Sequence, residues 1–82
     1  MNSDFIHQRS QVIAERVLEE GANTRERIQH AYKLLFGRTP SLEETTHVTT
    51  IIEGLVQDAG ESGVWLSVIR SMISSNEFLY LD

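Results

Sequence analysis

The sequence contains no cysteine, a single proline and only seven basic residues. Without cysteine there can be no disulfide framework, no thiolate metal site and no covalent haem attachment. Seven Lys and Arg against twelve Asp and Glu give a net charge of -5, so the positive surface typical of nucleic-acid binding is missing. No apolar run approaches the roughly 20 residues of a membrane span. We therefore expect neither nucleic acid as a partner nor insertion into a membrane.

The composition that remains is that of one small folded domain. The chain has 82 residues, of which 40% are hydrophobic and 23% charged, which is close to the average of globular proteins. Two hydrophobic cores in a chain of this length would each be too small to be stable. Residues 1–82 are therefore interpreted as a single domain.

The first half of the sequence predicts two helices. Asn2 or Ser3 is suited to cap the first helix, and Gly21 is expected to end it. Asn23, followed three residues later by an acid, predicts the start of the second helix, and Gly37 its end in a left-handed conformation. The apolar residues of the first helix recur at three- and four-residue spacing, and are Phe5, Ile6, Val12, Ile13, Val17 and Leu18.

The second half of the sequence predicts two more helices and a short final turn. Ser41 and Glu44 have the spacing of a capping box, which indicates a third helix directly after Pro40. Two glycines in residues 58–63 predict a loop. A fourth helix follows, with Trp65 on an uninterrupted apolar stripe that we expect to form the centre of the core. The expected fold is an all-α small bundle of four main helices with a short C-terminal helical turn.

No cofactor or metal site is predicted. His7, His30 and His47 fall on three different predicted helices, and only Glu44 and His47 have the Glu-x-x-His spacing found in di-iron bundles. Such a centre needs two copies of that motif and two further carboxylates, and Glu44 is already expected in a capping box. Nor does the sequence contain a Gly-x-Ser-x-Gly elbow for a nucleophilic serine. We expect the chain not to be an enzyme.

Residues 36–41 place Arg38 and a hydroxyl beside the start of a helix, where an anion can bind. The second glycine and the lysine of a P-loop are absent. The simpler interpretation is a turn between helices in which Arg38 bonds carbonyl groups or a carboxylate.

Two segments resemble a known family. Residues 31–44, which contain a Gly-Arg-x-Pro turn, and residues 74–82, which contain Asn76, Glu77 and Phe78, are similar in order and spacing to the C-terminal end of domain of unknown function 1553. That family belongs to large proteins of planctomycetes and related bacteria. A second similar pattern is a helical repeat family of secreted bacterial proteins with the same turn and a terminal Ser-x-Glu-Phe, which fits the middle of the chain better than its tail.

The resemblance implies an excised C-terminal fragment of a larger extracytoplasmic protein, and Met1 is then either a native start or an internal residue. Members often carry a cytochrome-c-like domain far upstream, and the C-terminal domain has no established activity. The implied function is a non-catalytic helical domain that packs on or completes its parent protein and mediates interaction with a protein or a carbohydrate complex. The partner is then the remainder of the parent polypeptide or another protein. The alternative is that Arg38 and Glu77 contribute to an active site formed with the rest of the parent.

The two motifs lead to one structural hypothesis. Each lies at a predicted helix end, where unpaired backbone groups need polar partners. We expect the final turn to dock beside the corner between the second and third helices, with Arg38 bonding Glu77 or nearby carbonyls and Phe78 entering the core. The competing interpretation is that Glu77 only caps its own turn with Ser74.

Overall fold

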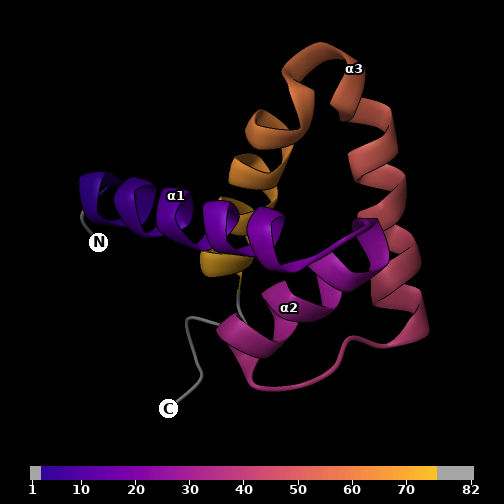
Figure 1. Cartoon of the computed structure of the whole chain (residues 1–82). Coiled ribbons are helices and arrows are strands. Elements are labelled where there is room, and N and C mark those ends of the chain that lie inside the picture. Colours follow the sequence, from indigo (N-terminus) through magenta and orange to yellow (C-terminus); the bar gives the residue numbers. More distant parts are fainter. Residues whose placement is uncertain (1–2, 76–82) are drawn as a thin grey trace.

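A computed structural model describes residues 3–75 of the chain (Figure 1). It contains three helices, α1 at Ser3–Glu20, α2 at Thr24–Phe36 and α3 at Leu42–Ile73, and each helix packs against the other two. The predicted all-α class is thus confirmed for the described residues. The predicted number of four main helices is wrong, because the third and fourth predicted helices belong to one element. The expected C-terminal turn lies outside the described residues.

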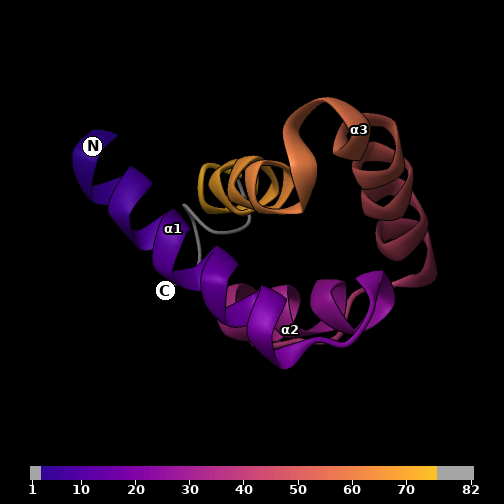
Figure 2. The ribbon, with the colours of Figure 1, turned by 45° about the horizontal axis from the view of Figure 1, so that its top comes forward.

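The helix α3 bends sharply at Gly60 and so acts as two arms, a first arm at 42–59 and a second arm at 61–73. Gly60 has φ 72° and ψ 169°, which is a non-helical conformation inside an otherwise helical stretch. The predicted loop at residues 58–63 is therefore wrong in extent, since a single residue changes the direction of the chain. Figure 2 shows the two arms as separate rods joined at this bend. Only glycine adopts this region of φ and ψ readily.

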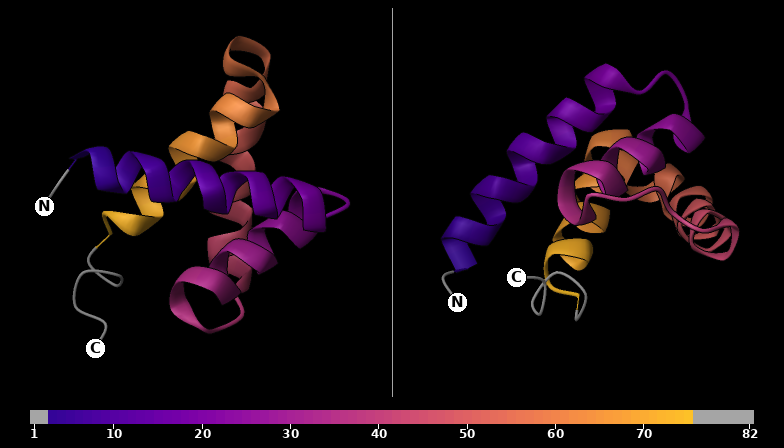
Figure 3. Two further views of the ribbon diagram at one scale, coloured as in Figure 1. Left: turned by 60° about the vertical axis from the view of Figure 1, so that its left-hand side comes forward. Right: turned by 90° about the horizontal axis from the view of Figure 1, so that it is seen from below.

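The second arm forms the centre of the core, as its apolar stripe predicts. Trp65 and Ile69 are almost completely inaccessible to solvent, at 1% and 0% exposure. The helix α1 crosses this arm, and α2 lies beside α1 and packs against both α1 and α3 (Figure 3). The buried apolar side chains of α2 and of the first arm are Ile28, Ala31, Tyr32, Leu35, Val48 and Ile52.

The buried face of α1 agrees with the predicted one only in part. Phe5 and Val12, which the spacing assigns to the apolar stripe, point outward and are more than half exposed. The other four residues of that stripe do contact the core: Val17 is buried, and Ile6, Ile13 and Leu18 are partly buried against it. Ser10 and Ala14, which the stripe did not include, face the core together with Val17, at positions i, i+4 and i+7 of one helical face. The hydroxyl of the buried Ser10 donates a hydrogen bond of 2.7 Å to the Ile6 carbonyl, so its polar group is satisfied.

The predicted helix ends are confirmed where the structure describes them. The side chain of Asn23 accepts from the backbone N–H of Glu26, and Gly37 has φ 70° in the left-handed region. Ser41 and Glu44 form a complete capping box at the start of α3. The helix α1 ends one residue before Gly21, as expected.

A long side chain ties the three helices together at the end of α1. Arg27 on α2 donates from Nε to the Gly21 carbonyl at 3.0 Å and from a terminal nitrogen to Glu61 on the second arm, also at 3.0 Å. A Cβ atom on Gly21 would meet the Arg27 side chain at 2.5 Å. Glycine is therefore needed here for close approach. This contact holds the residue that follows the bend next to the connection between α1 and α2.

Candidate functional site

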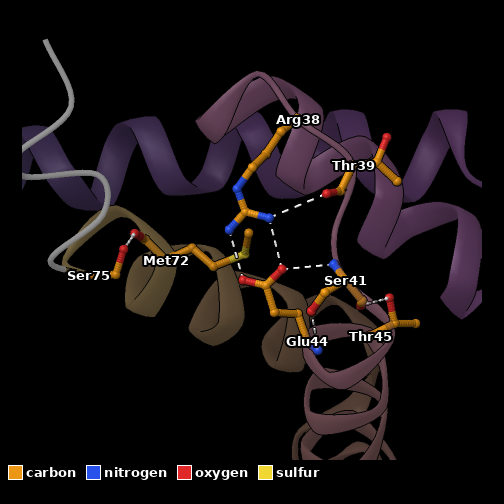
Figure 4. A network of polar contacts seen from close by, with 7 residues as sticks. All are labelled: Arg38, Thr39, Ser41, Glu44, Thr45, Met72 and Ser75. Atoms are coloured by element: carbon orange, nitrogen blue, oxygen red, sulfur yellow. Dashed lines mark hydrogen bonds and ion pairs between the residues drawn. The ribbon is translucent and has the colours of Figure 1, made fainter.

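The corner between α2 and α3 contains a closed ion pair. Arg38 follows directly after Gly37, whose left-handed backbone ends α2 and turns the chain toward α3. Both terminal nitrogens of Arg38 donate to Glu44, to Oε1 and Oε2, at 2.8 Å each (Figure 4). The fork of the guanidinium thus matches the two oxygens of the carboxylate, which is the strongest geometry for such a pair.

The guanidinium of Arg38 also lies over two aromatic rings of α2. Its central carbon is 5.3 Å from the ring centre of Tyr32 and 5.8 Å from that of Phe36. The two rings pack edge to face, with their centres 5.3 Å apart. Because an aromatic face attracts a cation, these rings help to fix the orientation of Arg38.

Glu44 has two structural roles at once. Its Oε1 accepts the backbone N–H of Ser41 at 2.8 Å, while its own N–H donates to the Ser41 hydroxyl at 3.1 Å. The hydrogen bonds from Arg38, followed by the one from the Ser41 backbone, lower the pKa of Glu44 to about 2. The carboxylate is therefore ionised throughout the physiological pH range.

The arrangement decides between the two interpretations of the turn, an anion site or a structural turn. The donors that an external anion would use, Arg38 and the Ser41 backbone, are bonded to the carboxylate of Glu44. Arg38 also donates to the Thr39 carbonyl at 3.3 Å. The interpretation of a turn whose arginine bonds a carboxylate and a carbonyl is thus confirmed. The identity of the carboxylate was missed, although the capping box itself points Glu44 back toward the turn.

An apolar groove lies beside the corner, between the two arms of α3. It has a volume of about 420 Å³ and opens to solvent. Ile51 and Leu55 of the first arm face Val68 and Met72 of the second arm across it, and Phe36 contributes from α2. Figure 4 shows the Met72 side chain directed toward the Arg38–Glu44 pair, so the ion pair stands at one end of the groove.

The groove keeps large apolar side chains in contact with water. Ile51 is 38% exposed and Leu55 44% exposed, although both belong to the apolar pattern of the first arm. The polar residues among its lining are Glu44, His47, Ser67, Ser71 and Ser75. Sequence reasoning missed this groove.

The histidines are not brought together. His7, His30 and His47 lie on α1, α2 and α3, and His47 lines the groove while His30 lines a shallow hollow with Lys33. Within residues 3–75, no group of three or more histidine and acidic side chains is placed to hold a metal ion. Glu44, the other half of the Glu-x-x-His spacing, is bonded to Arg38 and Ser41.

Three of the predicted interaction residues, Asn76, Glu77 and Phe78, lie outside the described residues. The expected contact of Glu77 with Arg38 therefore stays a prediction.

Comparisons with protein-family models, with curated proteins and with solved structures gave no match to this chain. Among the helices of residues 3–75, none has the length and apolar character needed to cross a membrane.

Proposed function

We propose that this chain is a non-catalytic helical domain that packs on, or completes, a larger extracytoplasmic protein. The groove between the arms of α3 is the docking surface in this proposal. The observation that carries it is the exposure of Ile51 and Leu55 in a concave apolar site next to a rigid corner. Contiguous exposed apolar surface with polar residues at its rim marks a site of interaction with another protein or a ligand.

The lining of the groove favours an apolar protein segment as its occupant. Ile51, Leu55, Val68 and Met72 offer apolar contact, and methionine adapts its shape to different partners. A carbohydrate would require many more hydrogen-bonding groups than the serines and His47 at the groove supply. The resemblance to the C-terminal end of domain of unknown function 1553 supports the larger protein as the source of that segment.

The alternative function, an active site that uses Arg38 and Glu77, is less favoured. The guanidinium of Arg38 is already bound at both terminal nitrogens by Glu44 and lies over two aromatic rings. A group in this position stabilises a turn, and a substrate would have to displace Glu44 to reach it.

The test is binding between this chain and the remainder of its parent protein, measured by calorimetry. Leu55→Asp places a charge in the groove, and we expect it to weaken binding at least about tenfold, because an unpaired charge is costly in an apolar interface. Val12→Asp is the matched control, since Val12 is equally apolar, 59% exposed and located on α1. Equal affinities of the two variants would contradict the proposal. Turnover of a substrate that depends on Arg38 would favour the alternative.

A further inference from the structure

The groove lies next to the point at which the described residues end. Ser75 lines the groove itself, and its hydroxyl donates to the Met72 carbonyl at 2.7 Å, which closes the last turn of the second arm. Figure 4 places Ser75 beside Met72 at this end of α3. Seven residues of the sequence follow Ser75.

These seven residues have the composition that an apolar groove accommodates. Phe78, Leu79, Tyr80 and Leu81 are four consecutive large apolar residues, preceded by Glu77 and followed by an aspartate. Leaving four such side chains in water is unfavourable, and the same is true of the open apolar lining of the groove. Packing of the segment into the groove would therefore remove both sets of apolar side chains from water.

The length of the segment is sufficient. From Ser75 back to Ser67, the groove follows about 12 Å of the second arm, at 1.5 Å per helical residue. Seven residues reach at most about 23–25 Å when extended, so residues 76–82 are long enough to run along the whole groove. A tethered segment also has an effective concentration of roughly millimolar at a nearby site, which favours it over a free competitor of equal affinity.

From this juxtaposition we propose that residues 76–82 occupy the groove when no partner is bound, with Phe78 and its apolar neighbours against Ile51, Val68 and Met72. The inference rests on the proposed function, because it makes the segment a competitor of the docking partner. A partner then binds only by displacing residues 76–82, which makes the segment an autoinhibitory contact.

The experiment uses methyl NMR spectra of the full chain. In the double variant Phe78→Asp/Tyr80→Asp, the methyl signals of Ile51, Val68 and Met72 are expected to shift, while those of Val17, buried at the face of α1, stay in place. A synthetic peptide with the sequence of residues 76–82, added to this variant, should return the groove signals toward their wild-type positions in a saturable way. The milder variant Phe78→Ala should give smaller shifts of the same signals, and it keeps the test valid if the double variant is poorly folded.

Groove signals that are identical in the wild type and in both variants, with no response to the peptide, would overturn the inference. That result would leave the proposed function standing, provided that Leu55→Asp still weakens binding of the parent protein. Conversely, the groove signals could shift in the variants of residues 76–82 while no partner binds. That result would support the intramolecular contact and contradict the proposed docking function.

Discussion

The chain changes direction at the corner between α2 and α3 and again at Gly60, and the two turns are built in opposite ways. The corner between α2 and α3 is held by side chains, since Arg38, Ser41 and Glu44 bond to one another and to the backbone. At the bend in α3, Gly60 has no atom within 4 Å of the position that a Cβ would occupy. One turn depends on added interactions and the other on a missing side chain.

The difference shows how stability is distributed over the molecule. Hydrogen bonds at the corner are local, because all of its partners lie within seven residues of each other. The bend is instead stabilised by contacts between segments that are distant in the sequence. These are the packing of the second arm on α1 and the Arg27–Glu61 ion pair at 3.0 Å. We therefore expect substitutions at the corner to have modest effects and substitutions that affect the second arm to have large ones.

The largest expected effect is at Trp65, which anchors the second arm. Trp65→Ala removes the largest fully buried side chain and should lower the free energy of unfolding by about 3–5 kcal/mol. That is comparable to the whole stability of many small domains. Denaturant unfolding followed by circular dichroism measures it. A loss of less than about 1 kcal/mol would show that the second arm is not the centre of the core.

The next effect concerns the bend itself. Gly60→Ala forces a side chain into a conformation that is nearly exclusive to glycine, and should cost about 1–3 kcal/mol. Gly54→Ala is the matched control, because Gly54 lies in the helical first arm with nothing within 4 Å of its Cβ position. It should stabilise the chain by about 0.5–1 kcal/mol.

Opposite signs for these two identical substitutions would confirm that α3 is broken at Gly60. Equal effects would mean that the bend is not needed.

A smaller effect is expected at the corner, where pH is the informative variable. The pKa of Glu44 is about 2 in the folded chain, well below the 4.5 that an ordinary glutamate keeps in an unfolded one. A lowered folded-state pKa contributes stability that is present above the unfolded value and lost as the pH falls toward the folded value. The contribution of the Arg38–Glu44 pair should thus disappear between about pH 5 and pH 2.

The two side chains of this pair are 38% and 32% exposed, so solvent screens them and we expect a contribution of about 0.5–1 kcal/mol. Glu44→Gln should remove most of it at pH 7 and flatten the stability curve in the acidic range. Glu43→Gln controls for net charge, because Glu43 is an exposed acid one residue away. Parallel acid-unfolding curves for the wild type and Glu44→Gln would contradict the assigned role.

The smallest effect is expected for the predicted contact between Arg38 and Glu77. Since Glu44 already binds both terminal nitrogens of Arg38, the coupling of Arg38 with Glu77 should be near the lower end of contact energies, about 0.5 kcal/mol. A double-mutant cycle with Arg38→Ala and Glu77→Ala measures it in denaturant unfolding. Strictly additive losses would mean that the two residues do not meet.

The contrast between local interactions and packing of distant segments also explains which features could be predicted from the sequence. Asn23, Gly37 and the Ser41–Glu44 box mark helix ends because each acts through hydrogen bonds or dihedral angles within four residues, which the order of the sequence contains. The outward position of Phe5 and Val12 was not predictable in this way, because spacing shows that a helix has an apolar face without showing which of two overlapping faces is covered.

The candidate site also has one part that the sequence predicts and one part that it does not. Arg38 and a carboxylate partner were expected from the turn, whereas the groove was not, since it depends on the distance between Ile51 and Val68 on two arms that only the bend brings opposite each other. The two glycines of residues 58–63 indicated a break in the chain. They did not indicate that one residue is enough to make it.

The sequence by itself thus determined the all-α class, the caps at the corner and the apolar stripe of the second arm with Trp65. These follow from local hydrogen bonding and from a period of 3.6 residues. Only the tertiary structure decided the direction of the second arm after Gly60, the buried face of α1 and the open groove beside Met72. Such features arise from packing between distant segments, whose free energy depends on which surfaces meet and not on the residues of one segment alone.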